Sequence, residues 1–316
     1  MTPDTTSALL KWLLDGNQPS YRQTILSILP IPLLIILLII SVSGNIEIHN
    51  EPPGLFSALN ALFLTIFPLL VTYFATKGYL HSGLFSMLML GSGALTLCLS
   101  GALSGFILIW QNGGPYPAVT IFTWLLILQI IFHLAGGVSV FVGVHPGKDS
   151  LHRGLIVTFT YIGLASVSVL LAGMVLKDVL PLLLIEGYGA TTLRQSLIAS
   201  GTTASAIGGI LLLSFHLLSK TRFSYWYSMT MFLFTTSGIS YLFVKSVGGS
   251  TAWVARISLY LASIYLFIAI ISAIKELRSR GESLEEGVPQ LFRHHLDLLV
   301  EQLYVVRQNG NFEARN

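Results

Sequence analysis

Long, uninterrupted apolar runs dominate this sequence and leave few folds open to it. The hydrocarbon core of a bilayer is about 30 Å thick and takes roughly 20 apolar residues of α-helix to cross. The strands of a membrane barrel would instead alternate apolar and polar residues. The sequence therefore predicts an all-α integral membrane protein, a bundle of about eight transmembrane helices. The runs are residues 24–43, 55–76, 83–109, 118–142, 154–176, 193–218, 223–244 and 252–274.

The composition agrees with a lipid environment. Of the 316 residues, 53% are hydrophobic and only 10% are charged, whereas a soluble domain carries roughly a quarter charged residues. The lipid bilayer is therefore the first partner that we expect, and no basic stripe points to nucleic acid. The first run follows a mixed segment and lacks a small-residue cleavage site, so we interpret it as a retained span and not a signal peptide.

Lysine and arginine are concentrated in alternate loops. The segments 45–54 and 111–117 contain neither residue. Most of the basic residues precede the first run or follow the second, fourth, sixth and last runs: Lys11, Arg22, Lys77, Lys148, Arg153, Lys220, Arg222, Lys275, Arg278 and Arg280. Because cytoplasmic loops are enriched in Lys and Arg, the pattern predicts a multi-pass protein of the cytoplasmic (inner) membrane with both termini in the cytoplasm. Three residues near helix ends depart from it: Lys177, Arg194 and Lys245.

Three parts are expected along the chain. Residues 1–23 form an interfacial or cytoplasmic segment, 24–276 the transmembrane domain, and 277–316 a cytoplasmic helix and tail. In the last part, Ser283 and Glu286 have capping-box spacing. A short heptad-like seam follows them, made of Phe292, Leu296, Leu299, Leu303 and Val306. The seam fits either a helix packed on the cytoplasmic face of the bundle or a coiled coil with a second chain.

Arg256 is the first candidate for a ligand site. An ionisable residue inside a span is costly and is a functional candidate by default. Arg256 lies about one helical turn into the last run, close behind Trp253. It either extends to the outer interface beside Trp253, or is a buried cation that pairs with a carboxylate or receives an anionic ligand.

The loop at 177–195 is the second candidate. Thr191 or Thr192 can cap the helix that follows, whose free amides would then point outward and favour an anion. Glu186 and Arg194 would belong to such an outer site. In the alternative, the loop is an ordinary turn in which two carboxylates, Asp178 and Glu186, neutralise Lys177 and Arg194.

Two histidines lie within the apolar runs. His133 is well inside the fourth run, and His216 is near the inner end of the sixth. Histidine pairs ligate haem in membrane cytochromes, but these two differ in depth by roughly 12 Å at 1.5 Å per residue, which argues against haem. No cofactor is assigned. His133 is expected to be a hydrogen-bonded interior residue and is kept as a candidate ligand contact. The single cysteine, Cys98, excludes a disulfide framework and a cysteine metal site.

Several stretches of this sequence, taken in their order along the chain, are similar to those of a known family. They include Glu51-Pro52-Pro53, Leu90-Gly91-Ser92-Gly93-Ala94-Leu95, Phe132-His133-Leu134-Ala135-Gly136, Tyr225-Trp226-Tyr227-Ser228, and the segments 59–65, 119–121, 187–195, 246–253 and 256–265. Over roughly 46–286 the chain resembles the multi-span N-terminal sensory region of bacterial and archaeal PAS-containing histidine kinases and related signalling proteins. The resemblance implies an input module that relays a stimulus into a cytoplasmic helix, whose place is taken by 282–308.

The sequence departs from that family by containing no PAS domain, no phosphoacceptor helix and no ATP-binding domain. We therefore expect a sensory or signal-input module that is a fragment of a longer protein or acts through a partner. No Walker loop, HExxH, nucleophile elbow or kinase signature occurs, so we expect no enzyme. The alternative is an accessory or structural subunit of a larger membrane complex. A transporter comes third, because no internal repeat and little interior charge are seen.

Overall fold

The computed structural model describes residues 21–44, 54–110, 115–142, 150–185, 189–219, 221–244 and 248–279. Three predictions lie outside these residues: the interfacial segment before residue 21, the C-terminal helix with its seam from Phe292 to Val306, and the position of Glu186.

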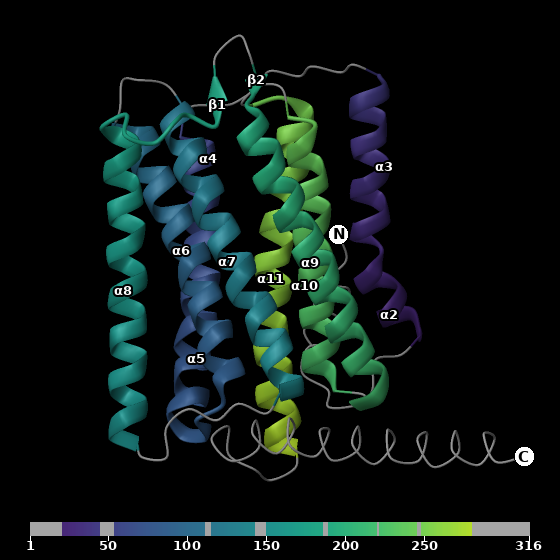
Figure 1. The fold of residues 1–316 in the computed structure, drawn as a ribbon. Helices are drawn as coiled ribbons and strands as arrows, with labels where there is room; N and C mark the ends of the chain where they lie inside the picture. Colours follow the sequence, from purple (N-terminus) through teal and green to yellow (C-terminus); the bar gives the residue numbers. More distant parts are fainter. Residues whose placement is uncertain are drawn as a thin grey trace, which may run out of the picture.

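Long helices lie roughly side by side and form one bundle (Figure 1). Each of the eight predicted apolar runs is helical. The first run contains α2 (Tyr21–Ile28) and α3 (Pro30–Ser43), and the second contains α4 (Leu55–Leu59), the π-helical segment η1 (Asn60–Ile66) and α5 (Phe67–Ser82). The remaining runs are α6 (Phe85–Trp110), α7 (Tyr116–Val142), α8 (Ser150–Leu176), α9 (Thr192–Ser219), α10 (Arg222–Leu242) and α11 (Ser250–Ser279).

Seven helical stretches of the described chain are long and apolar enough to cross a membrane. The protein is therefore an all-α, multi-pass membrane protein. Many of its large apolar side chains face outward, as a lipid environment allows: on α8, Leu151 and Phe159 are 75% and 72% exposed. α10 is not among the seven. Its Ser, Thr and Tyr residues lower its hydropathy, and most of them are buried.

The helices differ in how much protein surrounds them. α10 packs along both α9 and α11, and α6 packs along α7. α11 also contacts α3, α5 and η1. α3 and α8 lie at opposite edges of the bundle in Figure 1. The largest apolar core joins side chains from α3 and from α5 through α11. α10 and α11 therefore lie inside the bundle, which explains why α10 can carry many polar side chains.

Prolines lie where the helix geometry changes in the first two runs. Pro30 begins α3 directly after a break at Leu29. Pro68 begins the turn that follows η1, and a proline cannot donate to the carbonyl four residues earlier. α6 approaches this region closely, because a Cβ on Gly101 would lie 2.7 Å from the Cβ of Leu64.

A small hairpin lies across one end of the bundle (Figure 1). Its strands, β1 (Leu184–Ile185) and β2 (Gly189–Ala190), are antiparallel. The backbone amide of Leu183 donates to Thr120 Oγ1 on α7 at 3.0 Å. Thr191 caps α9, since its Oγ1 accepts from the amide of Arg194 at 3.2 Å, which confirms one of the two predicted caps. We call this end the hairpin end and the other the opposite end.

Candidate functional site

A pocket lies at the hairpin end, where several helices begin or finish. Its walls come from the last turns of α6 and α10 and from the first turns of α4, α7, α9 and α11, with Leu184 of the hairpin. It encloses about 660 Å³ of space between atoms, including space open to its surroundings. Most of the wall is apolar, as Leu126, Phe122 and Ile198 illustrate.

Arg194 is the most unusual residue in the pocket. It lies in the first turn of α9 and is only 1% exposed. Its Nε and Nη1 atoms are buried and have no hydrogen-bond partner among the described residues. A buried charge without a partner costs several kcal/mol, so an isolated arginine of this kind is rare in a finished core. Of the two carboxylates in the predicted alternative for Lys177 and Arg194, Glu186 lies outside the described residues.

Arg256 enters the same pocket from α11. It is 6% exposed, so it is a buried cation and does not extend outward. Its Cζ lies 4.1 Å from the ring centroid of Phe56 and 5.3 Å from that of Trp253. Contacts at these distances are cation–π interactions, which stabilise a desolvated guanidinium. Trp253 is therefore a packing partner of Arg256.

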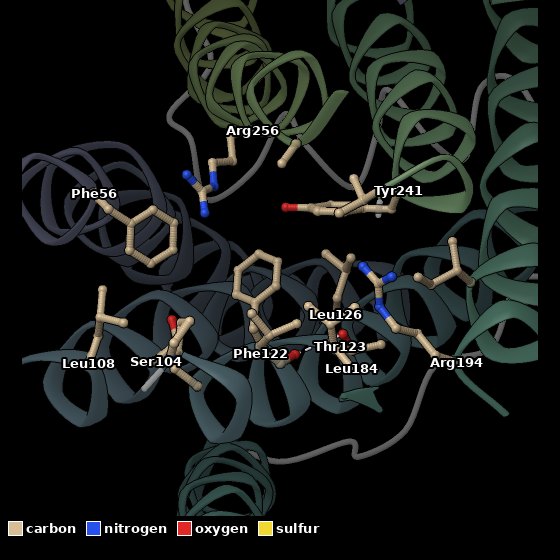
Figure 2. A pocket seen from close by; sticks show the side chains of 16 residues that line it. Phe56, Ser104, Leu108, Phe122, Thr123, Leu126, Leu184, Arg194, Tyr241 and Arg256 are labelled. Carbon is tan, nitrogen blue, oxygen red and sulfur yellow. Dashed lines mark hydrogen bonds between the residues drawn. The ribbon is translucent and has the colours of Figure 1, made fainter. Parts of the chain in front are cut away.

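Tyr241 lies between the two arginines. Figure 2 shows its phenol reaching into the space that both guanidinium groups border, with the hydroxyl directed toward Arg256. The ring also packs against Phe122, with 6.3 Å between centroids. Two cations and one hydroxyl thus converge in a pocket whose remaining polar side chains are already engaged: Thr123 and Ser104 donate to backbone carbonyls of their own helices. The arrangement can hold an anion next to an apolar group.

The structure brings together two of the five predicted site residues, Arg194 and Arg256, as lining of one pocket. Trp253 touches this site through Arg256. Glu186 lies outside the described residues. His133 does not line the pocket. Sequence reasoning missed Tyr241, Phe56 and Phe122, because an aromatic residue near the end of an apolar run looks the same whether it faces lipid or a pocket.

His133 is a buried, hydrogen-bonded interior residue, as predicted. It is 1% exposed, and its Nδ1 lies 2.8 Å from the hydroxyl of Tyr227 on α10. Its ring also packs against Phe234, with 5.7 Å between centroids. Its Nε2 has no partner among the described residues. One helical turn away on α7, Gln129 is fully buried, and both of its amide atoms lack partners there.

Haem does not fit this histidine. The free Nε2 would have to face the iron, yet it lies 2.9 Å from where a Cβ on Gly93 would stand. The ring is thus pressed against the backbone of α6, with no room for a macrocycle on that side. His216 is engaged elsewhere, since its Nδ1 lies 2.9 Å from the carbonyl oxygen of Thr221. Within the described chain, no three His, Cys, Asp or Glu residues gather as metal ligands do.

Comparisons with known protein families, with curated proteins and with solved structures find no match for this chain.

Proposed function

We propose that the protein is a membrane-embedded signal-input module whose stimulus acts at the pocket of the hairpin end. The observation that carries this proposal is the buried Arg194, whose Nε and Nη1 lack partners among the described residues, in a pocket shared by α9, α10 and α11. A site that is incomplete without a ligand can bias a two-state bundle, because a ligand shifts an equilibrium by its different affinity for the two states.

In this proposal the bundle crosses the membrane eight times, with α10 as the seventh crossing. α9 and α11 both begin at the pocket, so α10 must return through the bundle between them. Its polar residues do not oppose a membrane position, because they face protein. Ser228 and Ser240, for example, are fully buried, and their hydroxyls donate to carbonyls of α10.

The hairpin end then faces the outside, and both termini are cytoplasmic. Lys77, Arg153 and Arg222 lie at the opposite end of their helices, and positive residues favour the cytoplasmic side. The seven apolar helices support a multi-pass membrane protein, and this charge pattern supports the direction of insertion.

α11 is the helix best suited to carry a signal between the two ends. It has 30 residues, which at 1.5 Å each span about 45 Å. Arg256 and Ala252 border the pocket near its beginning. Near its middle, Tyr265 donates to the carbonyl of Ser27 at 2.9 Å and packs edge-on against Trp226, with 5.1 Å between ring centroids. A shift of α11 at the pocket would therefore alter its contacts with α2 and α10.

The proposal is tested by filling the pocket and measuring movement at the opposite end. In a Cys98→Ser background, spin labels at Leu151→Cys and Ile274→Cys report the distance between α8 and the far end of α11. Ala252→Leu, which fills pocket space from α11, should shift this distance distribution. Ala58→Leu is the matched control, because Ala58 is exposed at the same end.

An unchanged distribution in a folded Ala252→Leu protein would contradict the proposal. It would favour the structural alternative, in which the bundle is an accessory subunit of a larger complex.

A further inference from the structure

The missing hydrogen-bond partners of Arg194 indicate which chemical class of ligand the pocket would bind. Nε and Nη1 are two of the three nitrogen atoms of the guanidinium group, and neither has a partner in the described chain. Their N–H groups need acceptors, and charge-assisted hydrogen bonds to carboxylate oxygen atoms would satisfy them and compensate the positive charge. A neutral acceptor, such as an amide carbonyl, would leave the positive charge uncompensated in an apolar wall.

Two further groups favour an anion beside Arg194. The hydroxyl of Tyr241 reaches into the same space (Figure 2) and can donate a hydrogen bond. The first turn of α9, to which Arg194 belongs, carries the positive end of the helix dipole. Arg256, on the other side, is already in contact with Phe56 and Trp253, so Arg194 is the primary anchor.

The remainder of the pocket selects for an apolar body. Phe122, Leu126, Leu184 and Ile198 form its surface beyond the two arginines and Tyr241. A small hydrophilic anion would leave these side chains around empty or poorly hydrated space. A ligand with an apolar body would cover these side chains and fill that space.

We propose that this pocket binds a carboxylic acid with an apolar or aromatic body, its carboxylate held by Arg194 and Tyr241 and its body packed against Phe122 and Leu126. That this acid is the stimulus rests on the function proposed above; the binding itself does not. The acid could arrive from the aqueous side or from the lipid phase, and the probes below separate these two sources.

Binding is measured on the full chain in nanodiscs by calorimetry, with empty nanodiscs subtracted. The probes are 3-phenylpropanoate, its neutral analogue 3-phenylpropanamide, acetate, and palmitate incorporated in the disc. We expect 3-phenylpropanoate to bind about ten- to a hundredfold more tightly than the amide, as a charge-assisted pair implies. Acetate should bind far more weakly. If palmitate displaces 3-phenylpropanoate, the lipid phase is a source of the acid. If palmitate does not displace it, the acid comes from the aqueous side.

Substitutions at Arg194 decide the assignment. Arg194→Met should remove the preference for the acid over the amide, while Arg194→Lys, which keeps the charge and loses the planar guanidinium donors, should retain part of it. Arg153→Met is the matched control, because Arg153 lies on α8 at the opposite end, and it should retain the full preference. Should Arg194→Met fail to fold, Tyr241→Phe serves in its place, with an expected loss of about fivefold in affinity for the acid.

Equal binding of acid and amide, or an unchanged preference in Arg194→Met, would overturn the assignment of a carboxylate. The spin-label distance separates this result from failure of the proposed function. A carboxylate that binds through Arg194 but leaves the distance unchanged removes the signalling role and keeps the site. A distance that responds to Ala252→Leu, without any binding of the acid, removes the ligand class and keeps the signalling role.

Discussion

The two ends of α10 show opposite solutions to burying polar groups. At the opposite end, the hydroxyl oxygen of Tyr225 lies 2.5 Å from Oγ of Ser27, and the hydroxyl of Tyr265 on α11 donates to the carbonyl of the same serine. Trp226 packs against Tyr265 beside them. At the hairpin end, Tyr241 borders a pocket in which Nε and Nη1 of Arg194 have no partner among the described residues.

This difference indicates which end of the bundle stabilises the fold and which end binds a ligand. Satisfied hydroxyls within a packed aromatic cluster fix α2, α10 and α11 to one another, since each buried hydrogen bond that is removed leaves its partner unsatisfied. An unpaired cation in a cavity does the reverse, because it costs stability until a ligand arrives. Binding sites are commonly less stable than the scaffold that holds them. We therefore expect the opposite end to stabilise the fold and the hairpin end to have given up stability for recognition.

Truncating one tyrosine at each end gives the largest contrast. Tyr265→Ala removes a buried ring, its contact with Trp226 and its hydrogen bond to Ser27, so the free energy of unfolding should fall by about 3–5 kcal/mol. Tyr241→Ala should cost only about 1–2 kcal/mol, because its ring already borders a cavity. Denaturant titration in mixed micelles measures both values. Equal losses would show that the two ends do not differ in the way described.

Removing the charge of Arg194 should give a smaller effect of the opposite sign. Without ligand, Arg194→Met should raise the free energy of unfolding by about 1–4 kcal/mol, the range found when buried ionic groups are replaced by apolar ones. Arg153→Met is the control and should not stabilise the protein, because Arg153 donates to the carbonyl of Leu80 at 3.2 Å near the surface. A less stable Arg194→Met protein would identify Arg194 as a structural residue and not a vacant anchor.

The sequence predicted the helices well, and the reason is physical. Apolar runs long enough to span a bilayer have few alternatives to helix, so every run from 24–43 to 252–274 is helical. The cap at Thr191 was also accessible, since it depends on neighbours within a few residues. The hairpin strands were not predicted, and Gly189 in them has a φ of 80°, which is known only from the structure.

Only part of the pocket lining could be predicted from the sequence. Arg194 and Arg256 stood out because charge within apolar surroundings is rare. Their convergence with Tyr241 and Phe122 depends on how α7, α9, α10 and α11 pack, and no local pattern contains that information. For the same reason, the sequence could not decide whether carboxylates neutralise Arg194.

The cap of α9 gives the smallest test of the comparison. Thr191 Oγ1 accepts from the amide of Arg194 and donates to the carbonyl of Leu183 at 3.1 Å, so one side chain joins the hairpin to the turn that carries the anchor. Thr191→Ala should reduce the free energy of unfolding by about 1 kcal/mol, as lost N-caps do.

The same substitution should also weaken binding of 3-phenylpropanoate, since the turn that positions Arg194 loses its cap. Thr203→Ala is the matched control on α9. Its exposed hydroxyl donates only to the carbonyl of Ala199, so its effect should stay within about 0.5 kcal/mol, with unchanged binding. Should Thr191→Ala lose stability while binding stays the same, the cap would serve the fold alone, and the position of Arg194 would be set by the packing of α9 against α7 and α10.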